Sequence, residues 1–217
     1  MDPTPTLDAP VSLLKYLGAM EPFDDACWEL VESLGRYPTD ERLFDAYWRT
    51  LCFNTEFRGK EAPSDFKLAF QLWSSAFETA NILLKLIEGN VNPPEPDAEK
   101  DIELHNLWTF CLSCMMFCTL AKFMVQMEGG QRFESAFFAF CPGRKFCTTA
   151  NGFMGWVPAA AQVGDSICYF EACRLPFVIR KCGENYRVIG DSYIHGLMHE
   201  PVELMSFLYM GDLIKLI

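Results

Sequence analysis

The sequence predicts an α+β protein: a helical region over residues 1–129 that packs against a small five-stranded, barrel-like antiparallel sheet with a C-terminal helix, residues 130–217. Three observations predict this fold class. Apolar residues recur at helical spacing up to about residue 127, whereas short runs rich in β-branched and aromatic residues follow Pro142-Gly143. Residues 1–130 carry 10 basic and 21 acidic side chains and residues 131–217 carry 8 of each, so the two regions differ in build.

Composition excludes several classes of protein. The 217 residues are 50% hydrophobic and 22% charged, which rules out intrinsic disorder. A net charge of -11 argues against nucleic acid as a partner, because that affinity rests on clustered Lys and Arg. The sequence contains no phosphate-binding glycine loop, so we expect no nucleotide cofactor.

Ten cysteines raise the question of a disulfide framework. The acidic, proline-rich start MDPTPTLDAP lacks the basic residues and apolar run of a signal peptide. We therefore expect a cytoplasmic protein whose thiols stay free and pack as small hydrophobic side chains.

Two helices are expected over residues 23–57, broken at Gly35-Arg36-Tyr37-Pro38 because proline cannot continue a helix. Thr39 is predicted to cap the second helix, with Asp40 and Glu41 in its first turn. A longer helix is expected from Ser64 to Gly89, followed by an exposed loop or linker at residues 90–97.

A further helix is expected over Ile102–Met127, ending at Gly129-Gly130. Its stretch Leu107–Ala121 carries no formal charge, which raises the question of a membrane span. The stretch has 15 residues, fewer than the roughly 20 that cross a bilayer, and three hydroxyl-bearing residues interrupt it. We therefore predict a buried core helix and expect no membrane span.

Five strands are predicted in the second region, at residues 144–149, 153–157, 166–170, 176–182 and 186–194. The first two flank Asn151-Gly152, a strong hairpin signal since both residues tolerate positive φ. Apolar residues at Val202, Met205, Leu208 and Tyr209 predict a helix over residues 202–210 that closes one open end of the sheet.

An ordered series of motifs runs through the C-terminal region. It comprises RKFCTTANGFMGWVP from Arg144 to Pro158, the pair Gly164-Asp165, the strand PFVIR from Pro176 to Arg180, and YRVIGDSYIHG from Tyr186 to Gly196. Upstream, FDAYWRTL from Phe44 to Leu51 belongs to the same series. Together these motifs resemble the region that follows the signalling domain in fungal heterokaryon-incompatibility (HET) proteins, from about Asp40 to Gly196.

The resemblance implies a regulatory or partner-sensing module and carries no catalytic residue to this chain. The cell-death activity of the family is attributed to the N-terminal HET signalling domain, which has no counterpart in this sequence. In the family the His-Gly pair leads into a Met-x-Gly-Glu turn, whereas here Met198-His199-Glu200-Pro201 lacks the glycine.

Several motif positions also have a physical role. Gly152, Gly155, Gly164 and Gly190 fall where a curved sheet must turn or let backbones approach. Asp165 is expected to hydrogen-bond its own turn, and Tyr193 to bury its ring while its hydroxyl finds a partner.

Two constellations suggest a metal site. Cys111, Cys114 and Cys118 share one helix face, with His105 as a distant fourth ligand, but apolar neighbours favour inert thiols in a packed core. His195-x-x-x-His199 has a zinc-binding spacing only on a helix, which Gly196 and Pro201 make improbable. We expect no metal or other cofactor.

The residue types for nucleophilic catalysis are also present: Cys182 or Cys147 as the thiol, His195 as the base and Asp191 to orient it. Nothing in the sequence places them together. The first hypothesis is therefore a non-catalytic interaction or regulatory module for protein partners, including a HET signalling domain, working through an apolar or acidic surface. The second is a cysteine- or metal-dependent enzyme using Cys182, His195 and Asp191. A third is that the chain is a fragment whose exposed patches serve an absent domain.

Overall fold

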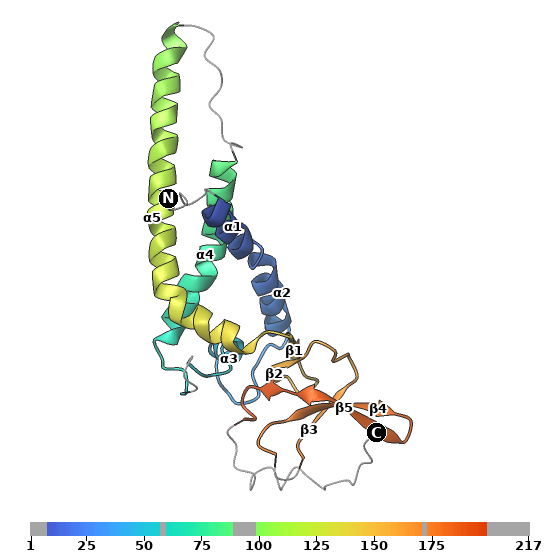
Figure 1. The fold of residues 1–217 in the computed structure, drawn as a ribbon. Helices are drawn as coiled ribbons and strands as arrows, with labels where there is room; N and C mark the ends of the chain where they lie inside the picture. The colour runs from blue at the N-terminus through green and yellow to red at the C-terminus, as the bar shows by residue number, and fades with distance from the viewer. Residues whose placement is uncertain (1–7, 57–59, 89–98, 171–172, 199–217) are drawn as a thin grey trace, which may run out of the picture. The chain divides into compact units, whose positions relative to one another are not determined.

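The computed structural model describes residues 8–56, 60–88, 99–170 and 173–198 (Figure 1). Within them the chain forms five helices and two antiparallel sheets of three strands each, which confirms the predicted α+β class. Contacts divide the chain into two compact units. Unit 1 comprises residues 1–25 and 68–132, and unit 2 comprises residues 26–67 and 133–217.

Unit 1 is helical. It contains α1 (Asp8–Gly18), the start of α2 (Glu21–Glu32), most of α4 (Phe66–Ile87) and most of α5 (Glu99–Phe140). Asn81 of α4 ties the first two helices to it, because its amide donates to the carbonyl of Gly18 at 3.3 Å and to the carboxylate of Glu21 at 2.6 Å. Helix α1 was not predicted from the proline-rich start of the sequence.

Helix α5 runs through Gly129-Gly130 and ends only at Phe140, so the predicted stop at these glycines is wrong. The reason is a tertiary contact between α5 and α4. A Cβ placed on Gly130 would lie 2.9 Å from the backbone nitrogen of Trp73, so glycine is what lets α5 approach α4 here. Beside this contact, the Gln126 amide donates to the Ser75 hydroxyl at 2.9 Å.

The uncharged stretch of α5 is not buried, which contradicts the prediction of a core helix. Phe110 and Phe117 are 66% and 72% exposed, and most of their neighbours from Leu107 to Val125 are exposed as well. Among the described residues, one helical segment, His105–Phe140, is long and apolar enough by length and composition to cross a membrane, with a mean hydropathy of 1.6 over its most apolar window.

Unit 2 begins with the end of α2 and with α3 (Leu43–Leu51). The predicted break between them at Gly35–Pro38 is confirmed, but the predicted cap is wrong. Arg42, in an extended conformation, precedes the first turn, and no side chain caps it. Asp40 and Glu41 therefore lie in the loop before α3, which leaves the Glu41 carboxylate free to reach the sheets.

The strands form two ladders. β1 (Arg144–Thr148), β2 (Met154–Pro158) and β6 (Tyr193–Ile194) make one sheet in the order β1-β2-β6. β3 (Ser166–Cys168), β4 (Phe177–Cys182) and β5 (Asn185–Asp191) make the other in the order β3-β4-β5. The Asn151-Gly152 hairpin is confirmed, with Thr148 opposite Met154 and Gly152 at φ 84°.

The segment predicted as one strand, residues 186–194, is two strands in different sheets. The chain changes sheet at Ser192, whose backbone N–H donates to the carbonyl of Pro176 at 2.8 Å and whose hydroxyl donates to the same carbonyl at 3.1 Å. A corner of this kind lets one continuous segment of chain contribute a strand to each of two sheets. The described strands therefore number six rather than five and form two three-stranded sheets, so the predicted single barrel-like sheet is not confirmed.

Trp156 of β2 lies at the centre of the unit 2 core and is 2% exposed. Its ring stacks on Phe53 and packs edge-on against Phe137 and Phe146, at centroid distances of 5.8 to 5.9 Å. Its indole N–H donates to the carbonyl of Thr50 at 2.9 Å, which satisfies its polar atom. Next to it in β2, Gly155 has no room for a side chain, since a Cβ would collide with the backbone of Tyr193 in β6.

Two predicted segments lie outside the described residues: the whole loop at residues 90–97, and the closing helix at residues 202–210.

Candidate functional site

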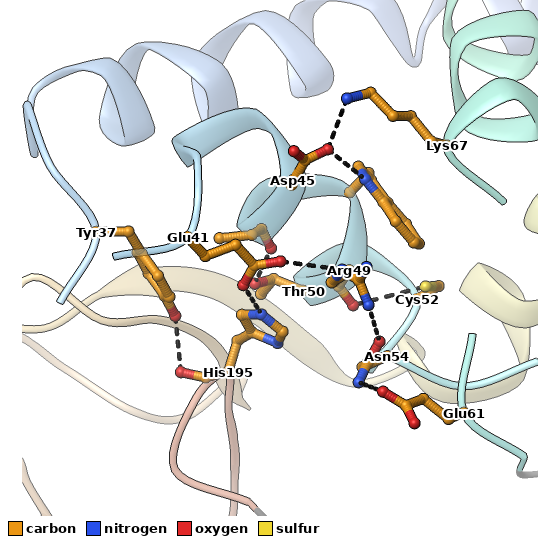
Figure 2. A network of polar contacts seen from close by, with 12 residues as sticks. Tyr37, Glu41, Asp45, Arg49, Thr50, Cys52, Asn54, Glu61, Lys67 and His195 are labelled. Carbon is orange, nitrogen blue, oxygen red and sulfur yellow. Dashed lines mark hydrogen bonds and ion pairs between the residues drawn. The ribbon is translucent and has the colours of Figure 1, made fainter. Parts of the chain in front are cut away.

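A network of polar side chains links the loop and helix at residues 37–54 to the end of β6 (Figure 2). The imidazole of His195 is held on both sides: Nε2 lies 2.9 Å from the carboxylate of Glu41, and Nδ1 lies 3.0 Å from the hydroxyl of Tyr193. Tyr37 donates its hydroxyl proton to the carbonyl of His195 at 2.7 Å and accepts from the N–H of Met154 at 3.4 Å. His195 is 6% exposed and Tyr37 is fully buried.

The network continues from Glu41 along α3. Arg49 forms an ion pair with the Glu41 carboxylate, with Nε 3.0 Å from Oε1, and donates from a terminal nitrogen to the side-chain oxygen of Asn54 at 3.3 Å. The Asn54 amide then donates to Glu61 at 3.4 Å. The network thus joins residues 37–61 to β2 and to the end of β6, which are distant in sequence, as a rigid junction requires.

Burial keeps both tyrosines of this network protonated. It raises the pKa of the Tyr37 hydroxyl and of the Tyr193 hydroxyl well above their usual value, and the nearby Glu41 carboxylate adds to the rise. Each phenol therefore remains a hydrogen-bond donor rather than a proton acceptor. Such groups suit a structural junction better than acid–base chemistry near neutral pH.

In the first turn of α3, the Asp45 carboxylate accepts a hydrogen bond from the Lys67 ammonium at 2.7 Å and another from the Trp48 indole N–H at 3.3 Å. Partial burial would raise the pKa of Asp45, but these two bonds and the Lys67 charge more than offset it and hold the pKa below its ordinary value. Asp45 is therefore ionised and anchors the chain that leads into α4.

A pocket of about 1090 Å³ opens elsewhere in unit 2, between the two sheets. Its walls include β1 and β3, each of which is one of the two edge strands of its sheet. Its apolar floor consists of Val157, Ala161 and Val178, against which Cys147 packs. At its rim, Asp165 accepts two bonds from the guanidinium of Arg180, at 2.8 and 2.9 Å, and one from the N–H of Gln162 at 2.8 Å.

Residues 117–206 match the family model described as the Het-6 beta-barrel domain. This Het-6 barrel match spans all six strands, the pocket and His195, and it supports the resemblance of this region to a part of fungal HET proteins. No curated protein and no solved structure matches the chain.

The structure does not bring Cys182, His195 and Asp191 together. Cys182 pairs with Asn185 at one end of the β4–β5 hairpin, whereas Asp191 pairs with Phe177 at the other, five residues or about 17 Å along the strand. Asp191 is instead engaged by the guanidinium of Arg144, which also donates to its carbonyl at 2.9 Å. His195 contacts Glu41 and Tyr193, neither of which belonged to the predicted trio.

The other predicted thiol, Cys147, lies in β1 opposite Gly155 and faces the pocket. Burial raises its pKa to about 11, which leaves little thiolate near neutral pH. An unactivated thiol is a weak nucleophile, so the position of Cys147 favours a packing role.

The residues considered as metal ligands do not gather into a site within the described residues. Among the described residues, no three His, Cys, Asp or Glu side chains are placed to share a metal ion. Cys111, Cys114 and Cys118 do lie on α5, but all three are exposed, so the packed core that we expected around them is absent. His199 lies outside the described residues.

The sequence analysis did not predict the hydrogen-bond partners of His195. Glu41 was expected in a helical turn and Tyr37 in a helix break, and neither pattern indicates a contact with a residue 150 positions later. The only signal available was their place beside the motif Phe44–Leu51, which the resemblance had already grouped with the strands. The expected roles of Asp165 and Tyr193 are confirmed by the bonds described above.

Proposed function

We propose that this chain is a non-catalytic, intracellular interaction module related to the C-terminal region of fungal HET proteins, and that it binds a protein partner through the apolar surface of α5. The observation that carries the proposal is the exposure of the apolar stretch of α5 from Leu107 to Val125. Large contiguous apolar patches on folded proteins mark surfaces that are covered by a partner.

The composition of this surface favours protein over lipid. Three aromatic side chains, Trp108, Phe110 and Phe117, can act as anchors of the kind that dominate binding energy in protein interfaces. Met115, Met116 and Met124 surround them, and methionine side chains adapt readily to the shape of a partner.

Charge supports the same choice. Lys122 is the single basic residue between Leu107 and Glu128, and the chain as a whole carries a net charge of -11. Cytoplasmic membrane surfaces are anionic and attract clusters of Lys and Arg, which are absent from this stretch. A protein partner such as a HET signalling domain, which the Het-6 barrel match makes the natural candidate, needs no such cluster.

The polar network and the pocket are consistent with this role. In the described part of unit 2, His195 and Asp191 are engaged by structural partners, and Cys182 lies at the opposite end of the β4–β5 hairpin from Asp191. A platform whose histidine and tyrosines are held by internal hydrogen bonds can present a surface without changing shape.

The test is co-expression with an intact HET signalling domain, followed by affinity capture and scoring of fungal viability. The variant F110S/F117S removes two exposed aromatic anchors, and L175S, an exposed apolar residue of unit 2, is the matched control. We expect F110S/F117S to weaken association by about tenfold or more, the equivalent of about 1.4 kcal/mol, and L175S to leave it unchanged.

Equal association of all three chains would contradict the proposal. Flotation of the purified chain with neutral lipid vesicles, abolished by F110S/F117S, would also contradict it, because α5 would then serve a membrane.

A further inference from the structure

We propose that the pocket in unit 2 binds a fatty acid, with the acyl chain against its apolar floor and the carboxylate on the ammonium of Lys145. The proposal goes beyond the function proposed for α5, since it concerns a small molecule and a different surface. It rests on the size of the pocket, on the apolar side chains of its inner wall, and on the charges at its rim.

The pocket has the size that an extended ligand needs. At about 1090 Å³ it lies just above the range of roughly 300–1,000 Å³ typical of small-molecule sites. It follows β1 from Lys145 to Thr148, about 10 Å of strand, and continues along the hairpin loop to Asn151. A ligand that fills this space is therefore elongated rather than compact.

The inner wall of the pocket is apolar. Val157 of β2 and Val178 of β4 are 6% and 2% exposed, and Ala161 packs with them in one cluster. Ile194 of β6, which is fully buried, also lines the pocket. These side chains come from both sheets and offer a ligand no hydrogen-bonding group. Such a wall favours the methylene groups of an acyl chain over a polar molecule.

The charges at the rim favour an anionic head group. Of the residues that line the pocket, Lys145 and Asp165 are the charged ones. Asp165 is neutralised by the guanidinium of Arg180, which donates to both of its oxygens. The Lys145 ammonium donates to the backbone carbonyl of Ala161, which carries no formal charge. The three side chains together therefore carry a charge of +1, and a carboxylate would balance it.

Lys145 also lies where the head of such a ligand belongs. It is opposite Val157 in the β1–β2 ladder, and its bond to Ala161 places the ammonium beside the apolar floor. An ammonium has three N–H donors, and the bond to Ala161 uses one of them. The Lys145 side chain is exposed, so a carboxylate bound to it would keep contact with water while the acyl chain is covered.

The surrounding sequence does not oppose an anion. All the lining residues lie within residues 131–217, which carry 8 basic and 8 acidic side chains, whereas the acidic excess lies in residues 1–130. An uncharged apolar ligand would use the floor but not Lys145, so it is the alternative that the test has to exclude.

The first test compares decanoate, a soluble fatty acid, with its uncharged counterpart 1-decanol. Binding of each to the full chain is measured by isothermal titration calorimetry. K145Q removes the charge, and K181Q, on an exposed lysine of β4 that does not line the pocket, is the matched control. We expect K145Q to weaken decanoate binding about fivefold or more without weakening 1-decanol binding, and K181Q to change neither.

The second test locates the ligand in the native chain. Cys147 packs against the floor of the pocket, whereas Cys111 is exposed on α5. Iodoacetamide labelling of both thiols is followed by peptide mass spectrometry, with and without saturating decanoate. We expect decanoate to slow the labelling of Cys147 severalfold and to leave Cys111 unchanged, because a bound acyl chain covers only the first thiol. F110S/F117S, which changes α5 alone, should bind decanoate like the wild type.

An absence of decanoate binding, or equal affinity of K145Q and the wild type for decanoate, would overturn the proposal. Equal weakening of both ligands by K145Q would also overturn it, because the charge of Lys145 would then not select a carboxylate. Protection of Cys111 in place of Cys147, lost in F110S/F117S, would assign the ligand to the apolar surface of α5 and overturn the pocket as its site.

Discussion

His195 Nε2 lies 2.9 Å from the carboxylate of Glu41, joining two residues 154 positions apart in the sequence. The contact links the turn after β6 to the loop before α3. Because Arg49 pairs with the other oxygen of the same carboxylate, Glu41 serves both the sheets and the helix. The stability of unit 2 should therefore respond strongly to this one side chain.

Replacement of Glu41 tests this dependence. E41A leaves the buried Nε2 of His195 without its hydrogen-bond partner and the Arg49 guanidinium without its ion-pair partner, and we expect it to lower the free energy of unfolding by about 2 kcal/mol. E41Q keeps an oxygen that can accept a bond and should cost less. Urea unfolding of the three chains, followed by tryptophan fluorescence, measures the difference. Equal unfolding free energies for E41A and the wild type would show that the contacts of Glu41 do not stabilise the fold.

Tyr37 supports the other side of the junction. Y37F removes the donor to the His195 carbonyl and the acceptor for the Met154 N–H while preserving the ring, so both backbone groups lose a buried partner. We expect a loss of about 1–2 kcal/mol in thermal or urea unfolding. Y186F, on a half-buried tyrosine of β5 outside this network, is the control and should unfold like the wild type.

The Asp165–Arg180 pair should make stability depend on pH. Bonds from Arg180, opposed by burial, hold the pKa of Asp165 below its ordinary value. The ionised carboxylate therefore stabilises the fold above its unfolded pKa of about 3.9, and this contribution disappears as pH falls through the lower folded value.

D165N lacks this contribution. The difference in unfolding free energy between wild type and D165N should be constant above about pH 5 and shrink below about pH 4. Denaturant titrations at several pH values measure it. A difference that grows on acidification would contradict the assigned direction of the pKa shift.

The two adjacent glycines of α5 should respond in opposite ways to alanine. At Gly130 a Cβ would press on the backbone of Trp73, which cannot move without shifting α4, whereas at Gly129 it would meet the end of the flexible Leu72 side chain. Alanine favours a helix over glycine by about 1 kcal/mol. We expect G130A to lower the melting temperature of the chain and G129A to leave it unchanged or raise it; the reverse order would contradict the close approach of α4 and α5.

Thiol reactivity should separate buried from exposed cysteines. Burial raises the pKa of Cys52 to about 12, so its reactive thiolate is scarce at pH 8. Cys111, Cys114 and Cys118 are exposed on α5. In the native chain iodoacetamide should label these three well before Cys52, as measured by peptide mass spectrometry. Early labelling of Cys52 would show that the packing around α3 opens readily.

The elements that were predicted correctly are those that neighbouring residues in the sequence determine. The Asn151-Gly152 hairpin follows from two residues that tolerate positive φ, and α4 follows from apolar residues at helical spacing between Phe66 and Ile87. No distant contact was needed to predict either.

The wrong predictions lie at positions where contacts between residues distant in sequence determine the local structure. Gly129-Gly130 has the composition of a helix end, but Gly130 serves the approach of α5 to α4. Residues 186–194 have the pattern of one strand, but Ser192 turns the chain from one sheet into the other. Glu41 could not be paired with His195 from sequence, because no periodicity connects positions so far apart.

The corner at Ser192 also has a kinetic consequence. β2 acquires its second neighbour only when β6 arrives, and β6 follows directly on β5, which belongs to the opposite sheet. The β3-β4-β5 ladder can form from consecutive strands, whereas the β1-β2-β6 ladder has to join pieces separated by about forty residues. Such distant pairings slow folding, and during synthesis the β1–β2 hairpin would wait for the two-residue strand β6 to leave the ribosome.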